Sequence, residues 1–226
     1  MAYNLLKGKR GIIFGALNDL SIAWKVAERA VEEGAEIVLT NTEISLRMGE
    51  ISKLAERCNA PVIAADATKV EDLEALVDKA MEHFGGKFDF VLHSVGMSPN
   101  VRKSIPYQSL NYTFLDRTLD ISAVSFHKVL QVLYAKDALN EWGSVVALTY
   151  MAAQRTFVGY SDMADAKALL ESVARSFGAI YGRDRKVRVN TVSQSPTATT
   201  AGKGIAGMGG MLDFAEAMSP LGNADA

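Results

Sequence analysis

A tyrosine and a lysine seven residues apart are the pair of side chains in this sequence best suited to chemistry. Tyr160 and Lys167 lie in a stretch whose pattern predicts a helix. At about 3.6 residues per turn, seven residues make nearly two turns, so both side chains would lie on one face. A nearby ammonium would lower the pKa of the Tyr160 phenol toward the working range of an enzyme. Such a pair could donate a proton or stabilise an oxyanion; the plainer alternative is a half-buried tyrosine beside a solvated lysine.

A glycine follows the first apolar run and precedes a predicted helix. Gly15 permits a tight turn, and the start of a helix offers free N–H groups and a positive dipole end to a pyrophosphate. The further glycines of a dinucleotide-binding turn are replaced by Ser21 and Ala23. This motif by itself fits a dinucleotide site and a simple strand-to-helix turn equally well.

Residues at the ends of two later apolar runs favour the dinucleotide. Asp66 follows the third run, where a carboxylate could meet an adenine. Ser94, Val95 and Gly96 follow the fourth, and the glycine would let the backbone approach a cofactor closely.

The end of the second run bears on which nicotinamide cofactor is bound. Thr42 stands close to the place of the acidic residue that binds an adenine-ribose hydroxyl, and we count it among the cofactor contacts. The nearby Glu43 would favour the free 2′-hydroxyl of NADH, whereas the nearby Arg47 would favour the 2′-phosphate of NADPH. We expect NADH because no basic cluster is present, and NADPH is not excluded.

The elements that would position these residues are short β-branched runs alternating with amphipathic stretches. Several runs are almost continuously apolar, as strands covered on both faces must be. In the helical stretch 71–84, apolar residues recur every three or four positions. We therefore predict a single α/β domain over residues 1–226, with a doubly wound, Rossmann-type parallel sheet. The predicted strands are Arg10–Phe14, Glu36–Thr40, Pro61–Ala65, Phe88–His93, Ser144–Thr149 and Val187–Val192.

Two stretches interrupt this alternation, and we predict both to be loops. Residues 97–111 carry two prolines and scattered polar residues. Residues 193–220 are rich in Gly, Thr, Ala and Met, with five glycines between positions 202 and 210. Both follow strand ends, where ligands bind in doubly wound sheets, and long loops in compact domains are often functional lids.

Composition narrows the class of protein. The chain has 226 residues, 49% of them apolar, and a net charge of −2, which offers no electrostatic case for nucleic acid or an anionic membrane. No apolar run approaches a membrane span, and no export signal precedes Arg10. The single cysteine, Cys58, excludes an internal disulfide and fits a reducing cytoplasm. We expect a cytoplasmic protein without a metal, since His83 and His127 lack ligand spacing, and His93 is expected to pack rather than react.

With these residues in view, the sequence resembles the NADH-dependent enoyl-[acyl-carrier-protein] reductases, a branch of the short-chain dehydrogenase/reductases. The resemblance runs from about Leu6 to Pro220. Ketone-reducing members of the superfamily have Tyr and Lys four apart and a serine thirteen residues before the Tyr, positions that hold Ala164 and Ala147 here. The motifs that carry it are Gly15 with Ser21-Ile22-Ala23, His93-Ser94-Val95-Gly96, Asp120-Ile121-Ser122, Leu148-Thr149-Tyr150 followed by Tyr160 and Lys167, Arg188-Val189-Asn190 and Pro196-Thr197.

The resemblance implies a role for each matching residue. Tyr160 would stabilise the enolate formed when hydride reaches the β-carbon of a trans-2-enoyl thioester, and Lys167 would hold the nicotinamide ribose. Tyr150 would border the acyl group or act as an aromatic plug at a strand end. The implied catalytic residues are Tyr150, Tyr160 and Lys167; the implied cofactor contacts are Gly15, Ser21, Ile22, Thr42, Asp66, Ala67, Ser94, Val95, Gly96, Lys167 and Thr197; the implied substrate contacts are Met97, Tyr150 and Tyr160.

Further expectations follow from the family. Residues 194–220 resemble its mobile substrate loop, whose Met208, Met211, Leu212 and Phe214 could cover an acyl chain or pack as a short helix. Acyl carrier protein would deliver the substrate. The family continues with one more helix and a seventh strand, which we expect to be missing from a sequence that ends at Ala226, and a homotetramer is expected if that part is present. The alternatives are another short-chain reductase and a non-catalytic dinucleotide-binding remnant.

Overall fold

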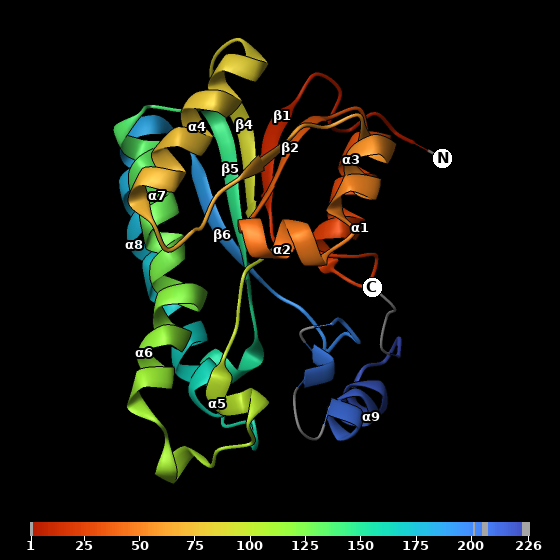
Figure 1. Cartoon of the computed structure of the whole chain (residues 1–226), viewed down its shortest axis with the longest axis vertical. Helices are drawn as coiled ribbons and strands as arrows, with labels where there is room; N and C mark the ends of the chain where they lie inside the picture. The colour runs from red at the N-terminus through yellow and green to blue at the C-terminus, as the bar shows by residue number, and fades with distance from the viewer. Residues whose placement is uncertain (1, 201, 205–207, 223–226) are drawn as a thin grey trace.

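The computed structural model describes residues 2–200, 202–204 and 208–222, and its strands form one sheet (Figure 1). The predicted strands are confirmed, with small changes at the ends of the second and sixth strands and larger ones in two other strands. The fifth strand begins five residues earlier than predicted, and the third keeps only three residues. The strands are β1 (Arg10–Phe14), β2 (Glu36–Asn41), β3 (Val62–Ala64), β4 (Phe88–His93), β5 (Leu139–Thr149) and β6 (Arg188–Ser193).

The sheet has the order β3-β2-β1-β4-β5-β6, and the neighbouring strands pair in parallel. This is the doubly wound, Rossmann-type topology that the alternation of elements predicts. The order reverses between β1 and β4, where Ile12 faces Val91 in register. The connections that follow β1 and β4 run over opposite faces of the sheet. In folds of this class, ligands bind beside the carboxyl ends of the two strands at such a point.

Helices cover both faces of the sheet (Figure 1). α4, α7 and α8 lie on one side, and α1 and α3 lie on the other, while α9 lies beyond the carboxyl ends of the strands. The helices are α1 (Ile22–Glu32), α2 (Glu43–Met48), α3 (Ile51–Cys58), α4 (Val70–Phe84), α5 (Pro99–Arg102), α6 (Tyr112–Leu119), α7 (Ser125–Ala135), α8 (Asp162–Arg185) and α9 (Met208–Met218). No helix in the described part of the chain has the length and apolar character needed to cross a membrane.

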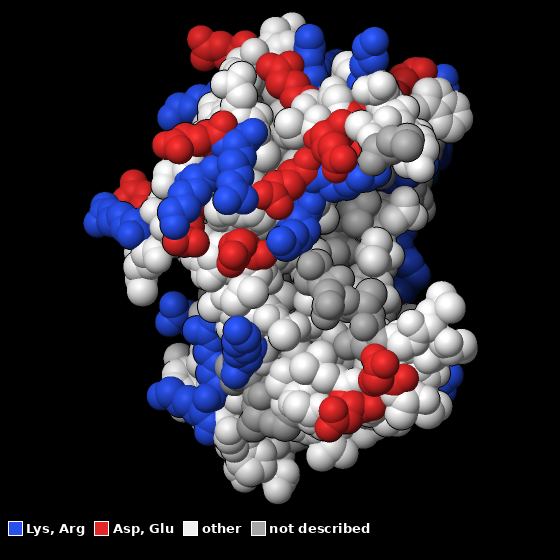
Figure 2. Space-filling model, turned by 90° about the vertical axis from the view of Figure 1, so that its right-hand side faces the viewer, with Lys and Arg blue, Asp and Glu red and all other residues white. Residues whose placement is uncertain are grey.

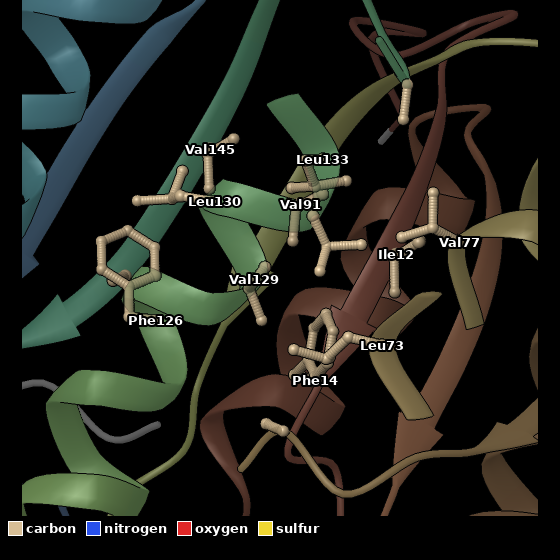
Figure 3. Close-up of a cluster of buried hydrophobic side chains, with 14 of the residues drawn as sticks. Ile12, Phe14, Leu73, Val77, Val91, Phe126, Val129, Leu130, Leu133 and Val145 are labelled. Atoms are coloured by element: carbon tan, nitrogen blue, oxygen red, sulfur yellow. The ribbon is translucent and has the colours of Figure 1, made fainter. Parts of the chain in front are cut away.

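The alternation of side chains along β1 divides the core into two layers. Ile12 and Phe14 point toward α4 and α7, where they join Leu73 and Phe126 (Figure 3). Ile13 points the other way and packs in the layer that α1 and α3 cover. Each such side chain contributes about 1.5–3 kcal/mol when fully buried, so both layers hold the sheet and its strand ends firmly.

The two stretches predicted as loops contain short helices, so this prediction is wrong in part. Pro99 can open a helix because its missing N–H is not needed in the first turn, and the Ser98 hydroxyl caps α5 by accepting from the N–H of Val101 at 2.9 Å. In the second stretch, α9 forms despite its glycines and buries Met211. Residues 201, 205–207 and 223–226 lie outside the described residues. They include Gly207, one of the five glycines of the second stretch, and Ala226, the last residue of the sequence.

The Gly15 turn can be tested by substitution. Gly15 has a φ of +95°, and an added Cβ would lie 1.9 Å from the Ser94 carbonyl oxygen, so Gly15→Ala should lower the free energy of unfolding by more than about 1 kcal/mol. Gly182→Ala is the matched control, since a Cβ there meets no heavy atom within 4 Å and lies inside α8. The control should raise the free energy of unfolding by about 0.5–1 kcal/mol in urea unfolding. Equal effects of the two substitutions would contradict this account of the turn.

Candidate active site

The turn after β1 is built to leave the start of α1 open. Ser21 stands at the N-cap position of α1, but its hydroxyl does not cap the helix. It accepts instead from the N–H groups of Leu17 and Asn18, each at 3.1 Å, and so shapes the turn that Gly15 begins. The first N–H groups of α1, from Ile22 onward, therefore lack this side-chain cap, and a pyrophosphate is a suitable partner for such groups.

Asn41, at the end of β2, ties three strand ends together. Its side-chain amide donates to the Ala16 carbonyl at 3.0 Å, and its backbone carbonyl accepts from the N–H of Ala65 at 3.0 Å. Sequence reasoning missed this role of Asn41. The polar side chain at the end of a buried strand was the available signal.

The predicted adenine-side contacts form hydrogen bonds within their own loops. The Thr42 hydroxyl accepts from the N–H of Ser45 and caps α2. The Asp66 carboxylate accepts from the N–H and the hydroxyl of Thr68, at 3.0 and 2.7 Å, and Ala67 beside it is buried. These residues line the carboxyl ends of neighbouring strands β2 and β3, as predicted, while their role in cofactor binding stays a prediction.

The two charged residues that left the cofactor choice open pair with each other. Arg47 and Glu43 lie one turn apart on α2, with nitrogen and oxygen 3.3 Å apart. Both side chains are exposed, so the pair adds little stability, but the carboxylate offsets the positive charge that a 2′-phosphate would need. This pairing favours NADH over NADPH.

The segment after β4 passes between the turn of β1 and helix α8. The Ser94 carbonyl lies against Gly15, and Val95 packs on the core. Gly96 is exposed, and a Cβ added to it would lie 3.8 Å from the Lys167 ammonium nitrogen. The fold thus brings together Gly15, Ser94, Gly96 and Lys167, which are far apart in the sequence.

Ser122 holds this segment through contacts with the backbone of Met97, a role that sequence reasoning missed. It lies in a π-helical stretch, Asp120–Val124, between α6 and α7. Its hydroxyl oxygen lies 3.0 Å from the backbone nitrogen of Met97 and 3.2 Å from the carbonyl oxygen of the same residue. Single π-helical turns inside α-helices often mark functional sites, and the motif Asp120-Ile121-Ser122 was the signal in the sequence.

Tyr160 lies just before α8 and not on it, so the argument from helical spacing is wrong for this residue. The helix begins at Asp162, and the intervening Ser161 has a φ of +47°. Tyr160 is nevertheless buried against Tyr150, with ring centroids 4.9 Å apart. The Lys167 ammonium donates to the Leu148 carbonyl at 2.7 Å. Tyr160 and Lys167 are therefore each placed through a contact with the end of β5, to Tyr150 and to Leu148 respectively, rather than through a shared helix face.

The pKa of Tyr160 also differs from the prediction. Burial raises the pKa of its phenol well above its usual range, and the neighbouring Tyr150 raises it further. Burial lowers the pKa of Lys167 to about 8, because an ammonium is poorly solvated there. Tyr160 is therefore a neutral hydrogen-bond donor at physiological pH, and Lys167 is largely charged below pH 8.

His93 packs in the core, as predicted. Its Nε2 lies 2.9 Å from the Ser125 hydroxyl oxygen, and that hydroxyl donates to the Ile121 carbonyl at 2.7 Å. Burial is the main cause that lowers the pKa of His93 to about 3, so the ring is neutral. Within the described residues, no group of three potential ligands could hold a metal ion.

Two hollows flank the aromatic rings at the site. One, of about 430 Å³, is lined by Phe157, Met211 and Phe214 together with four neighbours. The other, of about 370 Å³, lies between Tyr150 and α9 and includes Pro196. Thr197 follows this wall, with its hydroxyl donating to the Ser195 carbonyl. The apolar lining of both hollows suits an acyl chain better than a polar ligand.

The surface charge is mixed rather than uniformly basic. In the upper part of the face shown in Figure 2, Lys and Arg side chains are interspersed with Asp and Glu. A polyanion would require a continuous basic surface, which this part of the face does not offer.

Comparisons with known proteins agree with the geometry. A sequence model of the family described as enoyl-(acyl carrier protein) reductase matches residues 15–225. The chain is 34% identical over 218 residues to enoyl-[acyl-carrier-protein] reductase [NADH] 2 of Rhizobium meliloti, covering 96% of this chain and 80% of that protein. It is 33% identical over 223 residues to the Rickettsia bellii enoyl-[acyl-carrier-protein] reductase [NADH] FabI, covering 98% and 83%.

A solved structure extends this likeness to the fold. The crystal structure of the FabI–NADH complex from Alistipes finegoldii superposes with a TM-score of 0.97 at 73% identity, over 99% of this chain and 79% of that one. The FabI structure from Candidatus Liberibacter asiaticus gives a TM-score of 0.87 at 28% identity, over 99% and 84%. On this agreement of sequence, fold and site, the chain belongs to the enoyl-(acyl carrier protein) reductase family.

Proposed function

We propose that this chain is an NADH-dependent oxidoreductase that reduces trans-2-enoyl thioesters of acyl carrier protein in fatty-acid synthesis. The observation that carries the proposal is that both Tyr160 and Lys167 are buried in contact with the end of β5: Tyr160 packs against Tyr150, and Lys167 donates to the Leu148 carbonyl and lies beside Gly96. The names of the relatives, which specify NADH and the acyl-carrier-protein substrate, support the same reaction.

The residues present fit a dinucleotide. Ser21 leaves the start of α1 without a side-chain cap, Gly15 keeps the turn tight against Ser94, and Gly96 leaves space next to the Lys167 ammonium. Gly15, Ser21 and Ile22 would hold the pyrophosphate, Asp66, Ala67 and Thr42 the adenosine half, and Ser94, Val95, Gly96, Lys167 and Thr197 the nicotinamide half. When bound, NADH supplies the hydride.

The chain's own residues then orient the thioester and its developing charge. The phenol of Tyr160 keeps its proton, because burial raises its pKa, and donates a hydrogen bond to the thioester oxygen as that oxygen becomes an enolate. Lys167 is anchored by the Leu148 carbonyl and presents positive charge to the ribose. Tyr150 and Met97 would contact the substrate, and the largely apolar hollows would accept its acyl chain.

Assembly and location are extensions of this proposal. We propose acyl carrier protein as the partner that presents the substrate, on the basis of the relatives' names. The homotetramer, the single domain and the cytoplasmic location stay predictions. Another short-chain reductase is disfavoured by the Ala164 and Ala147 positions and by the family match.

Turnover with site variants tests the reaction directly. We expect NADH oxidation with crotonyl and longer enoyl thioesters, followed at the nicotinamide absorbance, to fall roughly 10²-fold in Tyr160→Phe and to be lost in Lys167→Ala. Tyr3→Phe and Lys79→Ala, both on the surface, serve as matched controls and should stay near wild type. Absence of turnover with NADH still bound would refute the reductase and leave the dinucleotide-binding remnant, whereas turnover with a ketone alone would favour another short-chain reductase.

The pKa of Lys167 predicts how stability depends on pH. Its folded pKa is about 8 against a reference near 10.5, so between these values the unfolded chain binds more protons and stability should rise with pH. Below pH 8 the buried charge is unfavourable, on the order of 1–3 kcal/mol after allowance for its hydrogen bond. Lys167→Met should therefore be more stable than wild type at pH 7, by an advantage that shrinks from pH 8 to pH 10. An advantage that does not change with pH in urea unfolding would contradict the assignment.

Acyl-chain length tests the proposed role of α9. Phe214 lines both hollows, so Phe214→Ala should lower kcat/KM for a twelve-carbon enoyl thioester by roughly tenfold while leaving the four-carbon substrate nearly unchanged. Ile44→Ala, exposed on α2, is the control. A uniform loss on both substrates would show that Phe214 does not contact the chain end.

A further inference from the structure

A buried carboxylate lies at the start of α8, two residues after Tyr160. The Asp162 side chain is fully buried. Its Oδ1 accepts from the Ser98 hydroxyl at 2.6 Å, and its Oδ2 accepts from the Asn100 amide at 2.7 Å and from the Thr118 hydroxyl at 2.8 Å. These bonds and the positive end of the helix replace the solvation that a buried carboxylate loses.

All three donors belong to the connection between β4 and α6 or to α6 itself. Ser98 also caps α5 through the N–H of Val101. Asn100, which is fully buried, donates to the Asn111 carbonyl at 3.2 Å and accepts from the Asn111 N–H at 3.1 Å. One carboxylate therefore binds both ends of the 98–111 segment to the first turn of α8.

The two parts joined in this way carry opposite sides of the proposed active site. The β4–α6 connection begins with Gly96 and Met97, and α8 carries Lys167 and follows directly on Tyr160. Ser161, between Tyr160 and Asp162, has a φ of +47°, a conformation that a serine keeps only where its surroundings impose it. The local sequence therefore does not by itself determine how Tyr160 enters the site.

A second buried carboxylate on α8 holds a different contact. Glu171 accepts from the Thr149 hydroxyl and the Gln154 amide, each at 2.9 Å, and so ties the helix to β5 and to the turn after it. Asp162 is the fully buried carboxylate that ties α8 to the Gly96 side, whereas Asp165 on the same helix accepts from the Tyr107 hydroxyl at 3.3 Å at the surface. The two anchors act on different walls of the site and can be tested separately.

We propose that Asp162 is a positioning residue for the reduction, one that holds Tyr160 and Lys167 in place relative to Gly96 without touching the substrate. This inference rests on the proposed function. Without the hydrogen bonds of Asp162, the start of α8 would be free to move away from the 98–111 segment.

The main test compares two isosteric substitutions of buried carboxylates. Asp162→Asn places an N–H group opposite donors that need an acceptor. Glu33→Gln is the matched control: Glu33 is also buried and accepts from the N–H groups of Tyr3 and Leu5, away from the catalytic residues. Both variants should lose stability, but Asp162→Asn should also lower kcat by roughly 10- to 100-fold with a change in the KM for NADH of less than about threefold. Glu33→Gln should keep kcat within about twofold of wild type.

Crystal structures of wild type and Asp162→Asn supply a readout that does not need turnover. We expect the Tyr160 ring to shift relative to Tyr150, and Lys167 relative to Gly96. An active wild type with an equally active Asp162→Asn would overturn the positioning role alone. An inactive wild type would overturn the proposed function, and unmoved Tyr160 and Lys167 in the variant structure would then overturn the positioning role as well.

A milder variant covers the case in which Asp162→Asn does not fold. Thr118→Val removes one donor with little change of shape, and the hydroxyl it deletes has a second acceptor in the Phe114 carbonyl at 2.8 Å. We expect kcat to fall only a few-fold, because Asp162 loses one of its three hydrogen-bond donors and keeps the other two. An unchanged kcat in Thr118→Val would count against the proposal.

Discussion

Parallel pairing of β1 with β4 and of β4 with β5 is the constraint on which the site depends. Because parallel strands all end at the same edge, residues that follow them meet there whatever their separation in the chain. Gly15 and Ser94 are brought together in this way, and Lys167 of α8 joins them through its hydrogen bond to Leu148 near the end of β5. The two apolar layers around β1 hold this edge rigid, so that a glycine conformation at one strand end determines how closely the next segment can approach.

Several polar groups are buried near this edge, and each has a reason to be there. Lys167 donates to a strand carbonyl, Asp162 and Glu171 accept from neutral donors, and His93 is neutral in the core. Replacing a buried ionic network by apolar residues is often neutral or stabilising, so these groups are not required for the fold alone. Their burial is understandable if the site needs groups that keep one orientation.

The position of Tyr160 illustrates the limits of a spacing argument. A separation of seven fits one face of a helix, but the helix begins only at Asp162, and burial rather than the lysine dominates the pKa of the phenol. The chemical conclusion changes accordingly. A phenol whose pKa is raised serves as a hydrogen-bond donor to an enolate, whereas one whose pKa is lowered would serve as a ready acid.

The sequence by itself determined the strand and helix alternation, the sheet class, the Gly15 turn and the family motifs, because these depend on local periodicity, backbone sterics and residue identity. Runs such as Phe88–His93 are short and largely apolar, as strands covered on both faces are. Only the tertiary structure decided the roles of Asn41 and Ser122 and the anchoring of Asp162 by Ser98, Asn100 and Thr118. Those features depend on contacts between segments far apart in the chain, and hydrogen bonds and burial of that kind leave no periodic signal in the sequence.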